Sequence, residues 1–276
     1  MRFRVLDIET IPDFSVWTPG EDQYKLVPSF LAPGPITNQF QACALKIEPF
    51  PPPHACRVVA ISTVDIVMDF EKSPRYRFDS AVTTCNWSSD PPFDRAAEKS
   101  LLGDLSARMV GEEVTLVTWN GRTFDLPVLS MRSFRLGVPF DWYYKDRNLR
   151  YRYSDEGHLD LMDYLGDYGA SRNAKLGDVA RLIGLPGKVG EVSGAGVHDI
   201  YKSTLEETDF DVVYKKQQSV ARYCLQDTIQ TALIFLRSRF HLGKIDRDEY
   251  NRCLDTFVQS PIVNETIVIE WGNLSL

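Results

Sequence analysis

Short apolar runs alternate with longer segments of helical periodicity along most of the chain, and this alternation constrains the fold more than any other feature. Runs rich in β-branched residues predict strands, and apolar residues spaced by three or four predict helices. Strands are expected at 3–8, 57–68, 76–82 (antiparallel to 57–68), 114–119 and, as an edge strand, 261–271. Helices are expected at 93–110, 126–136, 158–165, 175–183, 213–240 and 247–258. This mixture indicates an α/β domain.

One long segment departs from the alternation. Residues 12–53 hold most of the 16 prolines, including the run Pro51-Pro52-Pro53. We expect little regular structure there, and a loop of this length inside a compact domain is usually functional or flexible. Residues 187–196 predict a glycine-rich loop, and 241–276 carries no assigned motif. We interpret residues 1–276 as a single domain with an insertion at 12–53 and a C-terminal extension at 241–276.

The charge balance limits how the chain could hold a polyanion. It has 31 basic and 38 acidic residues, which gives a formal net charge of −7. An acidic protein does not hold nucleic acid through a general positive field. Binding a polyanion would therefore need a local basic surface, bound metal ions, or both.

The five cysteines form no C-x-x-C pair, and their number is odd. A disulfide framework or structural zinc site is therefore not expected, and a reducing compartment, the cytoplasm, fits best. Acidic residues interrupt the first apolar run almost at once, which argues against a signal peptide. No uncharged apolar stretch is long enough to cross a bilayer, so no membrane association is expected.

Asp7 and Glu9 form a D-x-E pair at the end of the first predicted strand. Side chains at i and i+2 of a strand project on the same side, so these two carboxylates would repel each other unless protons or cations intervene. Hard divalent ions such as Mg²⁺ take oxygen ligands of this kind. Alone, such a pair is most often a solvated strand end.

Two further acids lie in suggestive positions. Asp125 ends the sequence N-G-R-T-F-D directly after the strand at 114–119, and open α/β sheets bind ligands at this end of their strands. We also expect Asp125 to be the N-cap of the next helix. Tyr223 and Asp227 are four residues apart on the predicted helix at 213–240, so they share one face. Each signal is weak in isolation: a helix cap would explain Asp125, and a surface Asp beside a half-buried Tyr is the favoured explanation of the second pair.

Together the three motifs, in this order, resemble the signature of the DEDDy exonucleases. From about residue 4 to 239 the chain is similar to the 3′–5′ exonuclease domains of family-B DNA polymerases, and more closely to the stand-alone PolB-like group. The likeness lies in V-L-D-I-E-T-I-P at 5–12, H-A-C-R-V-V-A-I-S at 54–62, W-N-G-R-T-F-D-L-P-V-L at 119–129, H-L-D-L-M-D at 158–163 and L-P-G-K at 185–188. It implies a ribonuclease-H-like fold, with a mixed central sheet flanked by helices.

The resemblance also implies a mechanism. Asp7, Glu9, Asp125 and Asp227 would hold two divalent cations, Mg²⁺ or Mn²⁺, and Tyr223 would orient the attacking water. The related histidine-type subclass has histidine five residues before the last acid, where this chain has arginine, so the tyrosine type is favoured. The implied reaction is hydrolysis of phosphodiester bonds from a free 3′ end, with single-stranded DNA favoured over RNA and nucleoside 5′-monophosphates as products.

The segment 131–152 carries more positive than negative side chains and is rich in aromatics. Arginine on phosphate and aromatic rings on bases hold single strands without sequence preference, although these aromatics could equally be core under a solvated basic face. A wedge or clamp from residues 12–53 is conceivable from its location alone. The residues expected to contact substrate are Asn120, Phe124, Arg132, Arg150 and Arg152.

Alternative hypotheses remain open. One is a nucleic-acid-binding or scaffold protein that kept the fold and lost catalysis. Another is a structural cation site on an unrelated enzyme, which leaves the position of Tyr223 unexplained. His158, Asp160 and Asp163 are interpreted as packing or positioning residues rather than metal ligands, because apolar residues lie between them at helical spacing.

Overall fold

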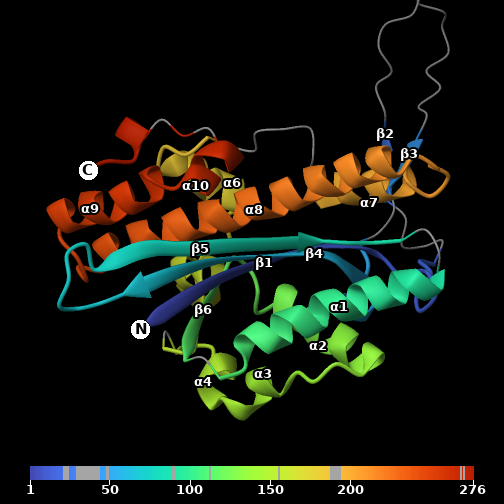
Figure 1. The fold of residues 1–276 in the computed structure, drawn as a ribbon, viewed down its shortest axis with the longest axis horizontal. Coiled ribbons are helices and arrows are strands. Elements are labelled where there is room, and N and C mark those ends of the chain that lie inside the picture. Colours follow the sequence, from blue (N-terminus) through green and yellow to red (C-terminus); the bar gives the residue numbers. More distant parts are fainter. Residues whose placement is uncertain are drawn as a thin grey trace, which may run out of the picture.

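The computed structural model describes residues 1–20, 25–28, 44–47, 50–88, 91–111, 113–154, 156–186, 194–267, 269 and 271–276. Five strands form one sheet in the order β5-β4-β1-β6-β7 (Figure 1). Strand β1 is antiparallel to β4 and parallel to β6, so the sheet is mixed. This order confirms the α/β, ribonuclease-H-like fold. The strands span Arg2–Pro12 (β1), Cys56–Met68 (β4), Tyr76–Cys85 (β5), Val114–Thr118 (β6) and His158–Asp160 (β7).

Helices cover both faces of the sheet (Figure 1). The long helix α8 and helix α9 pack on one face, and α1 and α2 pack on the other. The helices span Pro91–Met109 (α1), Asp125–Leu136 (α2), Asp141–Lys145 (α3), Arg147–Arg150 (α4), Leu161–Leu165 (α5), Leu176–Leu182 (α6), Gly194–Lys202 (α7), Phe210–His241 (α8), Arg247–Val258 (α9) and Pro261–Thr266 (α10). No helix within these described ranges is both long enough and apolar enough to cross a lipid bilayer.

The central strand β1 is buried on both faces, and its alternation decides which helix each side chain meets. Val5 belongs to the core cluster under α8, whereas Leu6 and Ile8 belong to the cluster under α1 and α2. Successive side chains of a strand point to opposite faces. Asp7 and Glu9 therefore project toward the face that α8 covers.

The insertion begins and ends at one place, because β1 and β4 are antiparallel neighbours and Pro12 pairs with Cys56. The main-chain amide of Asp13 donates a hydrogen bond to the carbonyl of Ala55 at 2.7 Å, which joins the outgoing and returning legs. Within the described part of the insertion, β2 (Lys25–Pro28) and β3 (Ala44–Ile47) form a separate antiparallel pair. The expected lack of regular structure is therefore wrong for these two strands.

Several short elements differ from the sequence-based predictions. The segment 158–165 is a three-residue strand followed by a helix, because residues 158–160 pair with β6. The predicted edge strand at 261–271 is wrong: Pro261, with its preset φ, starts α10 instead. Gly194 to Gly196 begin helix α7, while the rest of the predicted glycine-rich loop, 187–193, lies outside the described residues.

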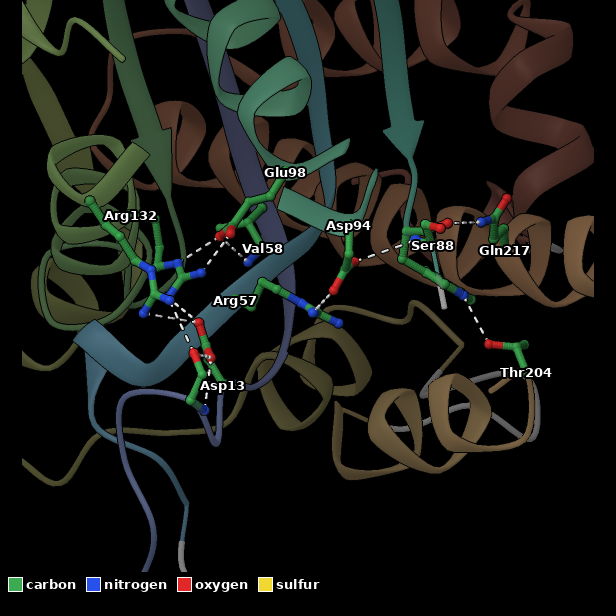
Figure 2. A network of polar contacts seen from close by, with 12 residues as sticks. Asp13, Arg57, Val58, Ser88, Asp94, Glu98, Arg132, Thr204 and Gln217 are labelled. Atoms are coloured by element: carbon green, nitrogen blue, oxygen red, sulfur yellow. Dashed lines mark hydrogen bonds and ion pairs between the residues drawn. The ribbon is translucent and has the colours of Figure 1, made fainter. Parts of the chain in front are cut away.

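A buried ion-pair network fixes the root of the insertion against α1 and α2 (Figure 2). The Arg132 guanidinium donates to both carboxylate oxygens of Glu98, at 2.7 and 2.6 Å. Its Nη1 donates to Asp13 on the outgoing leg at 2.8 Å and to the carbonyl of His54 on the returning leg at 3.3 Å. Glu98 also accepts the amide N–H of Val58 at 3.0 Å. One arginine thus holds both legs of the insertion.

A second group of polar contacts extends this network toward α7 and α8 (Figure 2). Arg57 at the start of β4 pairs with Asp94 on α1. The indole N–H of Trp87 donates to the Thr204 hydroxyl at 3.0 Å, and the Gln217 amide donates to the Trp87 carbonyl at 3.0 Å. Elements from both sides of the sheet are therefore tied together near the end of β1.

Replacing Arg132 by Leu is expected to lower the free energy of unfolding by about 3–5 kcal/mol, because buried Glu98 would lose the charge that compensates it and Asp13 would keep only Arg135, at 3.3 Å. The Arg132 and Glu98 side chains are only 2% and 1% exposed. Arg152→Leu is the matched control, since the Arg152–Asp163 pair has the same forked geometry but its arginine is 49% exposed. Chemical denaturation of both variants measures the difference. Equal losses of stability would contradict the assignment.

Candidate active site

Strand β1 supplies two acids to the space beneath α8. Glu9 is buried, and Asp7 is partly exposed. A carboxylate oxygen of each and the Cys224 thiol all lie within 4.8 Å of one another. The register between β1 and β4 shifts just after Glu9, so the regular ladder ends beside these acids. The D-x-E pair is therefore an inward-facing pair under a helix rather than a solvated strand end.

The third acid, Asp125, is presented by the turn between β6 and α2. Asn120 adopts a left-handed φ of 66°, and a Cβ on Gly121 would approach the Thr118 side chain to 2.5 Å. These two positions demand residues that tolerate a tight turn. Asp125 is the first residue of α2, and Phe124 occupies the N-cap without a side-chain bond, so the predicted capping role of Asp125 is wrong. The carboxylate of Asp125 instead accepts the main-chain amide of Ile8 on β1.

Asp160 holds this turn in place. Its carboxylate accepts the main-chain amides of Asn120 and Arg122, each at 2.9 Å, and it also caps α5. Beside it the buried His158 ring shares a hydrogen bond of 2.8 Å with the Thr118 hydroxyl. Burial lowers the pKa of His158 well below its usual value, so this ring is neutral at physiological pH. These contacts agree with the interpretation of His158 and Asp160 as packing or positioning residues.

Helix α8 supplies the remaining groups from successive turns. The Tyr223 hydroxyl is hydrogen-bonded to the Asp227 carboxylate, one turn further along. Between them the buried Cys224 thiol donates to a carboxylate oxygen of Asp7 at 3.5 Å and to the Asp7 carbonyl at 3.6 Å. Cys224 therefore joins α8 directly to β1 at the level of the acids.

The electrostatics show that the four acids occupy one place. The pKa of Asp7 is raised well above its ordinary value by burial and then by the negative charges of Asp125, Glu9 and Asp227. Burial raises the pKa of Asp125 to about 7, although two main-chain amides oppose this shift. Burial and neighbouring carboxylates thus favour the protonated forms of Asp7 and Asp125.

This donor set fits divalent metal ions. Oxygen ligands on converging segments are what Mg²⁺ and Mn²⁺ prefer, and a cation would offset the negative charges that raise the pKa of Asp7. Asp7, Glu9, Asp125 and Asp227 are the residues that would hold such ions. The expected convergence of all five residues, Tyr223 included, agrees with the structure, while their individual roles remain predictions.

The residues predicted to contact substrate lie in different surroundings. Asn120 and Phe124 lie in the turn that leads to Asp125. Arg150 is exposed, with its guanidinium 5.4 Å from the centre of the Tyr144 ring. Arg152 is also exposed and makes an ion pair with Asp163. The prediction that Arg132 contacts substrate is wrong. Its side chain is buried and donates hydrogen bonds to Glu98, Asp13 and the carbonyl of His54.

Sequence analysis did not assign Cys224 a role, although it lies within the motif Y-x₃-D. It also gave no role to Asp13 and Glu98, which hold Arg132. Cys224 could have been found, because a residue directly after Tyr223 on a buried helix is close to the acids. Asp13 and Glu98 are 119 and 34 residues from Arg132, and no local pattern marks such partners.

The four acids and Tyr223 therefore lie close together on an α/β fold. Residues 48–266 match the family described as "Predicted 3'-5' exonuclease related to the exonuclease domain of PolB". The chain therefore belongs to this family. The match includes Asp125, Tyr223 and Asp227 and starts after β1, so Asp7 and Glu9 rest on the geometry alone. No curated protein sequence matches the chain.

Solved structures of exonuclease I are similar to the chain at low identity. The structure of E. coli exonuclease I in complex with a dT13 oligonucleotide has 12% identity and a TM-score of 0.34, with 90% of this chain and 45% of that chain covered. The zinc-bound E. coli exonuclease I–ssDNA complex has 14% identity and a TM-score of 0.38, with 89% and 45% covered. The chain thus spans less than half the length of these proteins. TM-scores and identities this low do not indicate which reaction this chain catalyses.

The metal-free protein should lose stability as the pH rises through neutrality. Asp125 has a folded pKa of about 7 against an ordinary value of 3.8. Its contribution to stability is fully present below the lower value and is lost as the pH rises through the higher one. Between pH 5 and pH 8 in EDTA, the wild type should lose on the order of 3 kcal/mol relative to Asp125→Asn. Denaturant titrations at both pH values measure this difference, and parallel behaviour of the two proteins would refute it.

Proposed function

We propose that the chain is a metal-dependent 3′–5′ exonuclease that hydrolyses phosphodiester bonds of nucleic acid, favours single-stranded DNA and releases nucleoside 5′-monophosphates. The observation that carries this proposal is the meeting of Asp7, Glu9, Asp125 and Asp227, with Tyr223 hydrogen-bonded to the last of them. Family membership supports the same reaction class.

Two bound Mg²⁺ or Mn²⁺ ions would acidify the attacking water and stabilise the leaving oxygen. The chain itself must gather these ions and leave positions open for phosphate. In this proposal Asp7, Glu9, Asp125 and Asp227 would hold the ions: Asp7 would serve both, Glu9 and Asp227 would serve one, and Asp125 would serve the other. The Ile8 amide and the Cys224 thiol keep Asp125 and Asp7 oriented, because each donates to one of these carboxylates.

Tyr223 orients the attacking water without removing its proton. Burial and the charges of Asp227 and Glu9 raise the pKa of Tyr223, so its hydroxyl stays protonated at neutral pH. A hydroxyl that donates to Asp227 still has lone pairs that accept a hydrogen bond from water. Tyr223 can therefore fix the direction of the water while serving poorly as a base.

The segment that was expected to bind single strands divides into two parts. Phe140 and Trp142 are core residues, whereas Tyr144, Tyr151 and Tyr153 are 52–58% exposed. Arg150 lies over the Tyr144 ring. Exposed aromatic rings and arginine bind bases and phosphates of a single strand without reading sequence. We therefore assign the approach of the strand to this exposed part.

Asp7→Ala is expected to abolish metal-dependent shortening of end-labelled nucleic acid, because the proposed shared ligand of both ions is lost. Single-stranded DNA and RNA of one sequence, each with Mg²⁺ and with Mn²⁺, would measure activity and preference together. Asp255→Ala, at an exposed position of α9, is the matched control and should degrade substrate like the wild type. A catalytically silent wild type would contradict the enzyme hypothesis and favour the scaffold alternative, whereas full activity of Asp7→Ala would show that the activity does not come from this site.

Tyr223→Phe is expected to reduce kcat about 100-fold, the scale typical of a lost proton-positioning group. Metal affinity should stay unchanged, because the phenol is not among the proposed ligands. Tyr214→Phe is the matched control, since it lies on the same helix and is 59% exposed. Single-turnover kinetics with calorimetric metal titration separates the two effects. A loss of metal binding in Tyr223→Phe would assign the residue a different role.

A further inference from the structure

Phe50 stands at the end of the insertion as an exposed aromatic ring. It is 71% exposed, although it is a phenylalanine in a chain that buries most of its large apolar side chains. A single exposed apolar residue needs no explanation in itself. The position of Phe50 relative to the four acids is what gives this ring a role.

Phe50 packs on the residue that precedes a proposed metal ligand. Its ring centre lies 5.5 Å from that of Phe124, with 56° between the ring planes. Phe124 is the N-cap of α2, and Asp125 follows it directly. Phe124 is partly buried against the core beneath α2, so it supports Phe50, and most of Phe50 is accessible to solvent.

The returning leg that carries Phe50 is held at several points. The Cys56 thiol donates to the Pro51 carbonyl at 3.4 Å, and the Ala55 amide donates to the Pro52 carbonyl at 2.8 Å. Arg132 donates to the carbonyl of His54 at 3.3 Å. The three prolines have restricted φ angles, which limits the motion of the segment further. The network of Figure 2 therefore fixes the stem on which Phe50 stands.

An uncharged stacking surface suits a site of this charge. Four carboxylates repel the phosphates of a substrate, and a basic side chain placed among them would compete with the metal ions for the same oxygens. A ring attracts a nucleobase through its face and adds no charge. Affinity for the reacting end of the strand can therefore come from stacking beside the acids, while the exposed arginines act further away.

We propose that Phe50 is a substrate-positioning residue on which the base at the 3′ end of the strand stacks, with Phe124 behind it. This rests on the proposed exonuclease function and deepens it, because it assigns part of the 12–53 insertion to the substrate site. The stacked base places the terminal phosphodiester beside Asp125. Phe50 makes no contact with the reacting atoms and acts by holding the nucleotide.

Phe50→Ala is expected to raise the KM for single-stranded DNA about tenfold, the change that the loss of one modest base–aromatic stack produces. Phe50→Trp should keep a KM near that of the wild type, whereas Phe50→Leu should behave like Phe50→Ala. Phe70→Ala is the matched control: this phenylalanine is 73% exposed, next to the end of β4, and should not change KM. An unchanged KM in Phe50→Ala would overturn the proposal.

A fluorescence measurement separates this inference from the proposed function. DNA with 2-aminopurine at its 3′ end should lose fluorescence when the base stacks on an aromatic ring. In Asp7→Asn, which is expected to bind DNA without cleaving it, addition of Phe50→Ala should remove most of this quenching, and Phe70→Ala should retain it. Equal quenching in both double variants overturns the stacking role even where the wild type is an active exonuclease. An inactive wild type overturns the exonuclease function, and the quenching then still decides whether Phe50 stacks.

Discussion

The mutual repulsion of four carboxylates in a partly desolvated site is the constraint on which the rest of the structure depends. Burial and neighbouring negative charges raise the pKa of Asp7, and burial raises that of Asp125, so gathering these groups opposes folding until protons or cations arrive. The segments that carry them are accordingly well anchored elsewhere. Strand β1 is central in the sheet, and the 32-residue helix α8 packs along it. Packing far from the site therefore holds the acids together.

Close to the acids, uncharged donors set the positions of the side chains. Main-chain amides meet Asp125 and Asp160, and a thiol meets Asp7. Such donors orient a carboxylate without neutralising it, which leaves its charge for a metal ion. The strong ion pairs of Arg132 lie seven residues from Asp125, about two turns along α2. Arg132 can therefore fix the helix that carries Asp125 without acting on the carboxylate itself.

Sequence alone predicted the elements whose pattern is long or whose partners are local. The helix at 247–258 has the predicted bounds, and the strand at 114–119 differs from β6 by one residue. The order of the three motifs was enough to predict that five residues far apart in the sequence lie close together in the structure. Predictions of short elements failed because pairing with distant segments decides their secondary structure, as it does where residues 158–160 pair with β6. The prediction that Arg132 contacts substrate failed for a similar reason. Its positive charge suggested a phosphate ligand, but its partners are acids far away in the sequence.

The insertion is placed where a chain can add a substrate surface without disturbing the acids. Strands β1 and β4 are antiparallel neighbours, and a short turn would have sufficed to join Pro12 to Cys56. Arg132 on α2 bonds both legs of this long connection, at Asp13 and at the carbonyl of His54. The start and the end of the insertion are therefore held to α2, the helix that begins with Asp125. Residues on that root keep a fixed relation to the site whatever the rest of the insertion does. Phe50 is such a residue, and its contact with Phe124 links the insertion to the first turn of α2. In the proposed role, an apolar ring there would supply affinity that a chain of net charge −7 cannot obtain from its overall field.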